Sequence, residues 1–368
     1  MRNWITNAGL SIITVLVVLC LAEIFFRFTY DQAEELSADL IWKTQKNNIA
    51  KKGRPPKTNI GGFIFTEDEL DEEIFQKEFV RILFLGDSFT EAAMVGLGNR
   101  FTDLIEDRLN NMSIETDISP KFHLFNAGLR GTCPRKWFKA FHAVAPAYKP
   151  HIVIAVFFLR DGTNLGTSLR RNNEVIETIK RKYENIPFYD ISYLVRYFCN
   201  KFAWQQFTEF LRQRIMSSYL GTDRERKRWK IESMFLARIA EECKQAGIPF
   251  HLVIFPLLFN LKDYEYHEVE REIANFAQRE NIPVFSLTPG FLGLEAQSLW
   301  FSRNDQHPNK KGHRIAADRL FPYVQKLILE EESARSNEPR QHPPQPPLDG
   351  LSPSPFGPPA CRRQMTEK

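Results

Sequence analysis

The sequence lacks the features that point to metal, redox or nucleic-acid chemistry. Its cysteines show neither CxxC spacing nor the Cys/His spacing of a zinc site; the five are Cys20, Cys133, Cys199, Cys243 and Cys361. The odd count argues against a dense disulfide framework and leaves a single bridge from Cys199 to Cys133 or Cys243 open. The net charge is only +4 and the basic residues are scattered, which gives no argument for nucleic acid. No Walker lysine follows the first glycine turn, so this turn does not predict a phosphate-binding loop.

The chain is rich enough in apolar residues for a sizeable core. Of its 368 residues 43% are hydrophobic, and 31 are phenylalanine. From residue 80 onward, short apolar runs alternate with amphipathic segments. The runs predict strands at 80–85, 122–125, 152–159, 250–255 and 283–287, and the segments predict helices at 101–110, 134–148, 229–246, 268–280 and 311–331. This alternation predicts a parallel sheet covered on both faces, a three-layer α/β/α sandwich.

An apolar segment at the N-terminus predicts one transmembrane helix. Residues 8–22 are uncharged, and their continuation to Phe26 gives roughly the 20 residues that a span needs. Glu23 and Arg27 are one helical turn apart and fit the headgroup level. We favour an uncleaved signal anchor, and a cleaved signal peptide ending at Ala22 is the alternative. Arg2 and the amino terminus before the span, and acidic residues after it, predict that the rest lies on the periplasmic or extracellular side.

Composition divides the chain into four parts. Residues 1–30 form the predicted anchor, and residues 31–79 are a polar stalk or lead-in segment. Residues 80–332 hold the α/β domain, and residues 333–368 are a Pro-rich tail that we expect to be disordered. Within the domain, residues 163–228 break the alternation and predict inserted helices. Such an insertion is either a substrate lid or a decoration packed on one side.

A serine follows the first predicted strand in a setting that suits a nucleophile. The buried run at 80–85 ends in a tight turn at Gly86, which leaves the Ser88 hydroxyl at the edge of the sheet. Serine needs a base to take its proton. Far along the chain, Asp305 precedes His307 in a Pro- and Asn-rich loop that opens a helix, where a carboxylate would orient the imidazole. We therefore expect these three side chains to meet.

Two more segments are expected at the same edge, because the carboxyl ends of parallel strands lie together. The second strand is followed by Asn126, Ala127 and Gly128, and this glycine lets a backbone N–H approach a substrate closely. The third strand is followed by a polar segment that includes Asp161 and Asn164.

In order and content these motifs resemble the SGNH (GDSL-type) hydrolase family, over roughly residues 80–329. The resemblance implies a flavodoxin-like α/β/α fold. It also implies that Ser88 is the nucleophile, that His307 is the base, and that the N–H groups of Ser88 and Gly128 form part of an oxyanion hole. Neither a metal nor an organic cofactor is required.

Two positions depart from the family pattern. Asp161 stands where the family has an asparagine that donates to the oxyanion, and an ionised carboxylate has no proton to donate. Either Asp161 is protonated, or Asn164 or Arg160 donates instead, or this donor is missing. The position three before the histidine is Asn304, so we expect Asp305 to be the acid and Asn304 to be a weaker orienter.

The resemblance and the anchor together predict a membrane-anchored serine esterase or acyl hydrolase. It would act outside the cytosol on an acylated glycan or lipid, by acyl transfer through Ser88. The alternative is a degenerate module without catalysis, or an O-acyltransferase, that assists the assembly or binding of an envelope glycan. The departures at Asp161 and Asn304 motivate this alternative.

Overall fold

The computed structural model describes residues 2–30, 57–60, 63–66, 79–116, 121–163, 169–302 and 305–337. The apolar runs form a five-stranded sheet whose neighbours all pair in parallel. Its strands are β3 (Phe79–Gly86), β4 (Lys121–Gly128), β5 (Ile152–Phe158), β6 (Phe250–Phe255) and β7 (Val284–Ser286), in the order β4-β3-β5-β6-β7. Every residue of β5 and β6 is buried, as expected for strands covered on both faces. The predicted strands are confirmed.

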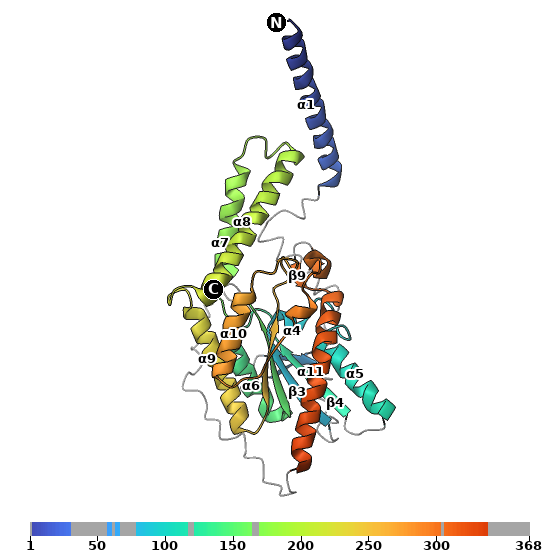
Figure 1. Ribbon diagram of the computed structural model, residues 1–368, viewed down its shortest axis with the longest axis vertical. Helices are drawn as coiled ribbons and strands as arrows, with labels where there is room; N and C mark the ends of the chain where they lie inside the picture. The colour runs from blue at the N-terminus through green and yellow to red at the C-terminus, as the bar shows by residue number, and fades with distance from the viewer. Residues whose placement is uncertain are drawn as a thin grey trace, which may run out of the picture.

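Helices cover both faces of the sheet, which confirms the predicted three-layer architecture (Figure 1). One face carries α5 (Phe101–Thr116) and α11 (Lys310–Asn337), which pack together. The other carries α6 (Pro134–Tyr148), α9 (Lys227–Gln245) and α10 (His267–Arg279). Right-handed crossovers explain this division, because the chain steps outward from β3 to β4 and then turns back to β5. The reversal lies between β3 and β5, the place where open α/β sheets bind ligands.

Large aromatic side chains join the sheet to its helices. Trp137 of α6, Phe101 of α5 and Phe157 of β5 are all fully buried. The rings of Trp137 and Phe157 meet edge to face, with centroids 6.1 Å apart. Burying one such side chain contributes on the order of 2–3 kcal/mol. The strand edge that carries the candidate site is therefore a rigid platform.

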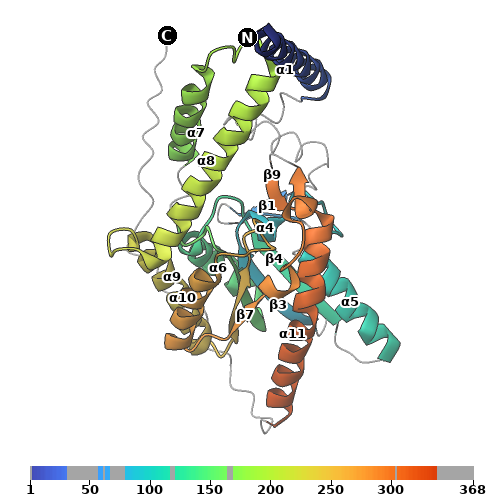
Figure 2. The same cartoon turned by 45° about the horizontal axis from the view of Figure 1, so that its top comes forward.

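Two elements project from the sandwich (Figures 1 and 2). α1 (Arg2–Thr29) confirms the predicted N-terminal apolar helix, and Asn7–Thr29 is the one candidate membrane span in the described part of the chain. α7 (Leu169–Glu184) and α8 (Tyr193–Leu220) form a helical hairpin within the predicted insertion. Figure 1 places the start of α8 near the C-terminal end of α1, and hydrogen bonds from residues 192–194 to Glu23 join the two helices.

Two short antiparallel pairs lie outside the predicted strands. β1 (Lys57–Ile60) pairs with β2 (Phe63–Thr66) within the segment predicted to be a stalk, and Gly61 and Gly62 separate the two strands in the sequence. β8 (Trp300–Ser302) pairs with β9 (Asp305–Pro308) where the sequence predicts a loop. Between β7 and β8 lie two 3₁₀ turns, at Thr288–Gly290 and Ala296–Leu299.

The remaining sequence predictions concern the chain ends and the cysteines. α11 continues past the predicted domain end at residue 332, and most of the predicted disordered tail, from residue 338, lies outside the described residues. Cys133, Cys199 and Cys243 are buried free thiols, so neither of the two disulfides that the sequence left open forms.

Candidate active site

Ser88 lies on a tight turn between β3 and the short helix α4 (Ser88–Glu91). The turn requires a glycine at position 86, because a Cβ on Gly86 would stand 2.0 Å from Thr90 Oγ1. Asp87 caps α4, since its Oδ1 accepts a hydrogen bond of 2.8 Å from Phe89 N. Ser88 is therefore the first helical residue after a buried strand, and its N–H has no acceptor within the helix.

Side chains from the end of β4 and from the turn after it hold α4 in place. Asn126 Nδ2 donates to Thr90 O at 2.7 Å and to Thr102 Oγ1 at 2.9 Å. The Arg130 guanidinium forms a two-point contact with the Glu91 carboxylate, at 2.6 and 3.0 Å. Such a fork-to-fork pair fixes orientation as well as distance. Sequence reasoning gave the Glu91–Arg130 pair no role, because nothing local indicates that the two residues meet.

The three residues predicted as a triad lie in one hydrogen-bonded row. His307 Nε2 is 2.8 Å from Ser88 Oγ, and His307 Nδ1 is 2.5 Å from Asp305 Oδ1. Asp305 is fully buried, whereas His307 is partly exposed. Both belong to β9, and residues two apart in a strand project to the same side. This alternation explains why Asp305 faces the imidazole although it is only two residues before it. Asn304 lies outside the described residues.

Asn309 fixes the strand that carries the histidine. Its Nδ2 donates to the carbonyl oxygens of Ser298 and Trp300, at 2.9 and 3.0 Å. Its Oδ1 accepts from the backbone N–H groups of Lys311 and Gly312, at 2.9 and 3.1 Å. One side chain thus joins the β8–β9 hairpin to the start of α11 and caps that helix.

Gly128, predicted as an oxyanion donor, is already engaged. Its N–H donates to Asn126 Oδ1 at 3.0 Å. A Cβ on Gly128 would stand 2.2 Å from Glu91 N. The glycine therefore serves the close approach of β4 to α4, and its N–H is turned toward the protein.

Gly131, which sequence reasoning overlooked, lies in the same loop. It is exposed, has a φ of +66°, and its N–H has no hydrogen-bond partner among the described residues. The loop folds over the end of β3, where Gly86 O accepts from Leu129 N and from Thr132 Oγ1, each at 3.1 Å. A second glycine three positions after Gly128 is the signal that could have found it.

Asp161 turns back onto the end of its own strand. Its Oδ2 accepts a hydrogen bond of 2.9 Å from Phe158 N. Burial, followed by the nearby charge of Asp87, raises the pKa of Asp161 well above its usual range, which favours the protonated form. The positive charge of Arg160 opposes this rise by lowering the pKa of both Asp161 and Asp87. The Nε of Arg160 is buried and has no hydrogen-bond partner in the described part of the chain. Asn164 lies outside the described residues.

Asp87 is a further buried acid beside the nucleophile, and the sequence assigned it no role. Its Oδ2 lies 3.4 Å from Ser88 Oγ. Burial raises its pKa, and the Phe89 N–H and the charge of His307 act in the opposite direction. With its cap to α4, this residue positions the serine.

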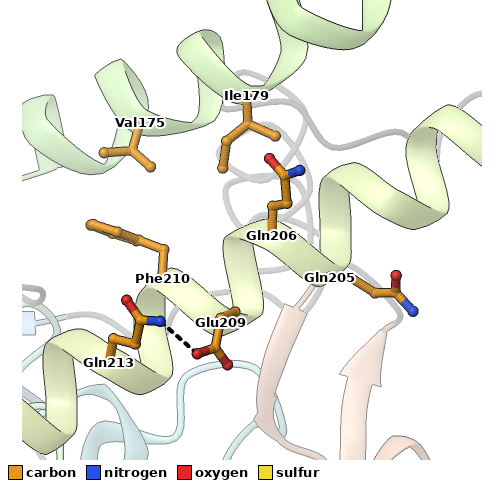
Figure 3. A pocket seen from close by; sticks show the side chains of 7 residues that line it. All are labelled: Val175, Ile179, Gln205, Gln206, Glu209, Phe210 and Gln213. Carbon is orange, nitrogen blue, oxygen red and sulfur yellow. Dashed lines mark hydrogen bonds between the residues drawn. The ribbon is translucent and has the colours of Figure 1, made fainter.

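A separate cavity of about 500 Å³ lies between α7 and α8 (Figure 3). Its lining combines apolar Val175, Ile179 and Phe210 with Gln205, Gln206, Glu209 and Gln213. No triad residue lines it, so it does not belong to the candidate active site. Among the described residues, no group of three His, Cys, Asp or Glu side chains is placed to hold a metal ion.

The sequence matches no protein-family model and no curated protein. Among solved structures the chain is similar to a lipolytic protein of the G-D-S-L family from Desulfitobacterium hafniense, at 14% identity and a TM-score of 0.37, covering 66% of this chain and 98% of that one. A psychrotrophic esterase from Pseudoalteromonas sp. is similar at 13% identity and a TM-score of 0.40, with 68% and 98% covered. An acetylxylan esterase from Geobacillus stearothermophilus is similar at 15% identity and a TM-score of 0.37, with 66% and 92% covered.

Proposed function

We propose that this chain is a serine esterase of the SGNH type. Ser88 is the nucleophile, His307 the base and Asp305 the acid that orients it. The observation that carries the proposal is the row of two contacts, 2.8 Å from Ser88 Oγ to His307 Nε2 and 2.5 Å from His307 Nδ1 to Asp305 Oδ1. At these distances the imidazole is able to take the serine proton while the carboxylate fixes its tautomer. The order of the sequence motifs supports the same roles.

The proposed reaction proceeds through an acyl-enzyme. His307 Nε2 takes the proton of Ser88 Oγ as that oxygen attacks the ester carbonyl, and Asp305 stabilises the imidazolium. The imidazolium then protonates the leaving alkoxide. Water, deprotonated by His307, attacks the acyl-enzyme and releases the acid. A sugar hydroxyl in place of this water would make the same site an acyltransferase.

The oxyanion needs donors aimed at the carbonyl oxygen as charge develops, and losing one typically costs about 10²–10³-fold in turnover. We assign this role to the backbone N–H groups of Ser88 and Gly131. Gly128 is a weaker choice because Asn126 already accepts from its N–H. In its neutral form, Asp161 carries no negative charge that would repel the oxyanion.

We further propose that α1 anchors the enzyme and that it acts outside the cytosol on an acylated glycan or lipid. The length and apolar surface of α1 support the anchor. The positive charges of Arg2 and the amino terminus before the span, and the acidic residues after it, support the orientation.

Covalent labelling tests the proposed chemistry. A fluorophosphonate probe should modify the full-length protein at Ser88, as located by peptide mass spectrometry, and the protein should hydrolyse short-chain nitrophenyl esters. Ser88→Ala should lose both activities, whereas the matched control Ser233→Ala should keep both. A Ser88→Ala protein that hydrolyses the ester as fast as the wild type would refute the assignment.

A module without catalysis is the second candidate, and the carboxyl group at position 161 favours it. In that case the folded wild-type protein would resist the fluorophosphonate at all pH values. Binding of acylated oligosaccharides, measured by calorimetry, would then persist in Ser88→Ala with unchanged affinity.

A further inference from the structure

The C-terminal part of α1 is bound to the start of α8. Glu23 Oε2 accepts from Ser192 Oγ at 2.7 Å and from Leu194 N at 3.1 Å, and Glu23 Oε1 accepts from Tyr193 N at 2.9 Å. The first N–H groups of a helix have no partners within it, and a carboxylate is a favourable acceptor for them. A residue of the candidate membrane span therefore caps a helix of the inserted hairpin.

Aromatic contacts extend this joint over the next turns of both helices. Phe26 stacks on Tyr197 with ring centroids 4.4 Å apart. Tyr30 lies edge-on to Tyr193 and to Tyr197, each at 6.3 Å. The Arg27 guanidinium lies 5.4 Å from the centroid of the Tyr193 ring. Tyrosines and arginines of this kind are typical of the membrane–water interface.

The hairpin tip, which we define as residues 185–202, exposes large apolar side chains next to this joint. Phe188 and Ile191 are each 68% exposed. Phe198 and Phe202, on the first turns of α8, are also exposed. Neighbouring exposed apolar side chains of this size mark an interaction surface more often than an ordinary solvated one.

The backbone at the tip is strained in a way that presents one of these side chains. Phe188 has a φ of +68°, in the left-handed region that favours glycine. A bulky aromatic residue there is costly for folding, so its ring is expected to have a use outside the fold.

We propose that the hairpin tip binds the surface of the lipid bilayer that α1 crosses, with Phe188 and Ile191 inserted at the boundary between headgroups and acyl chains. This inference rests on the proposed role of α1 as an anchor. Glu23 lies about 9 Å before Thr29 along the helix axis, at about 1.5 Å per residue. The start of α8 is therefore level with the last turns of the span. That depth matches the roughly 5–10 Å to which interfacial segments bury their apolar face.

Exposed cations near the tip fit an anionic lipid surface. Arg181 and Lys182 are exposed at the C-terminal end of α7. Basic groups beside an apolar tip add electrostatic attraction to anionic headgroups. Because α1 would cross the bilayer next to the hairpin tip, we take the bilayer surface as the partner that the exposed side chains of the tip contact.

A depth measurement tests the proposal on the full-length protein in nanodiscs of phosphatidylcholine and phosphatidylglycerol. Phe188→Cys, labelled with the NBD fluorophore, is made in a background that carries Cys20→Ser and Cys361→Ser; the other three cysteines are buried. Leu329→Cys is the matched control, because Leu329 is an exposed apolar residue in the C-terminal half of α11. That half of the helix lies at the end of the sandwich remote from α1 (Figure 1). We expect a blue shift at 188 and quenching by nitroxides placed near the lipid headgroups, and neither effect at 329.

Three outcomes would overturn the proposal. NBD at 188 with the same emission and quenching as at 329 would show a solvated tip. A blue shift without lipid quenching would show that a protein partner, such as a second copy, covers the tip. An intact mass showing that the mature chain starts at Glu23 would mean that the membrane span has been cleaved off. Fluorophosphonate labelling of Ser88 in the same nanodiscs reports on the esterase separately, because no tip residue belongs to the active site.

Phe188→Gly provides a folding control for this experiment. Glycine adopts a positive φ without strain, so the melting temperature of Phe188→Gly should be at least that of the wild type. In the same protein, NBD at position 191 should lose quenching by lipid nitroxides. Unchanged quenching at 191 would count against Phe188 as an anchor.

Discussion

Replacing Asp305 by asparagine should disable the proposed triad while leaving its shape intact. Asp305 is fully buried, and its Oδ1 accepts from both the ring Nδ1 and the backbone N–H of His307, at 2.5 and 3.2 Å. An amide keeps the volume but carries no charge. Its N–H₂ group also favours the tautomer in which Nε2 carries the proton, and that nitrogen then has no lone pair to accept the proton of Ser88.

The size of the loss follows from the charge and the tautomer. Two unit charges about 4 Å apart attract by about 4 kcal/mol at an effective dielectric constant of 20. Removing that attraction from the imidazolium raises the barrier by a similar amount, which is about 10³-fold in rate. The wrong tautomer brings the expected loss to about 10³–10⁴-fold.

The assay is the second-order rate constant for fluorophosphonate labelling of Ser88, together with kcat/KM for a nitrophenyl ester, measured between pH 5 and 9. Circular dichroism confirms that Asp305→Asn is folded. Asp223→Asn is the matched control, because Asp223 is a surface carboxylate whose partner is Lys230. Activity of Asp305→Asn within tenfold of the wild type would refute the assigned role. An equally large loss in Asn304→Ala would transfer the role to that residue.

Two more carboxyl groups give predictions that depend on pH. Burial raises the pKa of Glu106 from 4.5 to about 7, so the folded state holds a proton that the unfolded state releases above pH 4.5. The wild type therefore loses stability between pH 4.5 and 7, by at most about 3 kcal/mol. Glu106→Gln, whose amide oxygen still accepts from Leu124 N, should avoid this loss. Urea unfolding at pH 4.5 and 8 measures the free energy of unfolding of both proteins. An equal loss of this free energy between the two pH values in the wild type and in Glu106→Gln would contradict the prediction. Burial likewise raises the pKa of Asp161 and favours its neutral form, so turnover should fall as rising pH ionises this group if Asp161 faces the proposed oxyanion. Asp161→Asn should lack that fall in its profile of kcat/KM against pH, and identical profiles would exclude Asp161 from the site.

The sheet and its helices were predictable because burial on both faces requires long apolar runs. Residues 152–158 of β5 are apolar throughout, and no other element accommodates them as well. β9 was not predictable in this way. Its sequence, Asp-Gln-His-Pro, has no apolar alternation, and it is a strand because β8 supplies the ladder.

The site itself was predictable where chemistry dictates residue type. The positions of Ser88 and His307 in the sequence predicted that a serine hydroxyl and an imidazole would meet, and Ser88 Oγ lies 2.8 Å from His307 Nε2. The choice between Asn304 and Asp305 depended on the extended backbone of β9, which local sequence did not reveal. The role given to Gly128 overlooked the carboxamide of Asn126, which folds back onto its N–H. Such contacts are set by tertiary packing rather than by motif.

The length of α8 bears on which esters reach Ser88. The helix starts at the capped joint with α1, and near its other end the Tyr219 hydroxyl donates to Leu159 O, just beyond β5, at 2.6 Å. Its 28 residues span about 42 Å at about 1.5 Å per residue. If α1 anchors the chain and Ser88 is the nucleophile, as proposed, α8 would act as a spacer that separates the serine from the lipid surface. In that arrangement, an acyl group esterified to glycerol within the leaflet would have to leave the bilayer to reach Ser88. In the proposed enzyme, a substituent of a polysaccharide that extends away from the surface would meet the Ser88 hydroxyl without leaving its polymer. We therefore expect reach to favour acylated glycans over lipids within the leaflet.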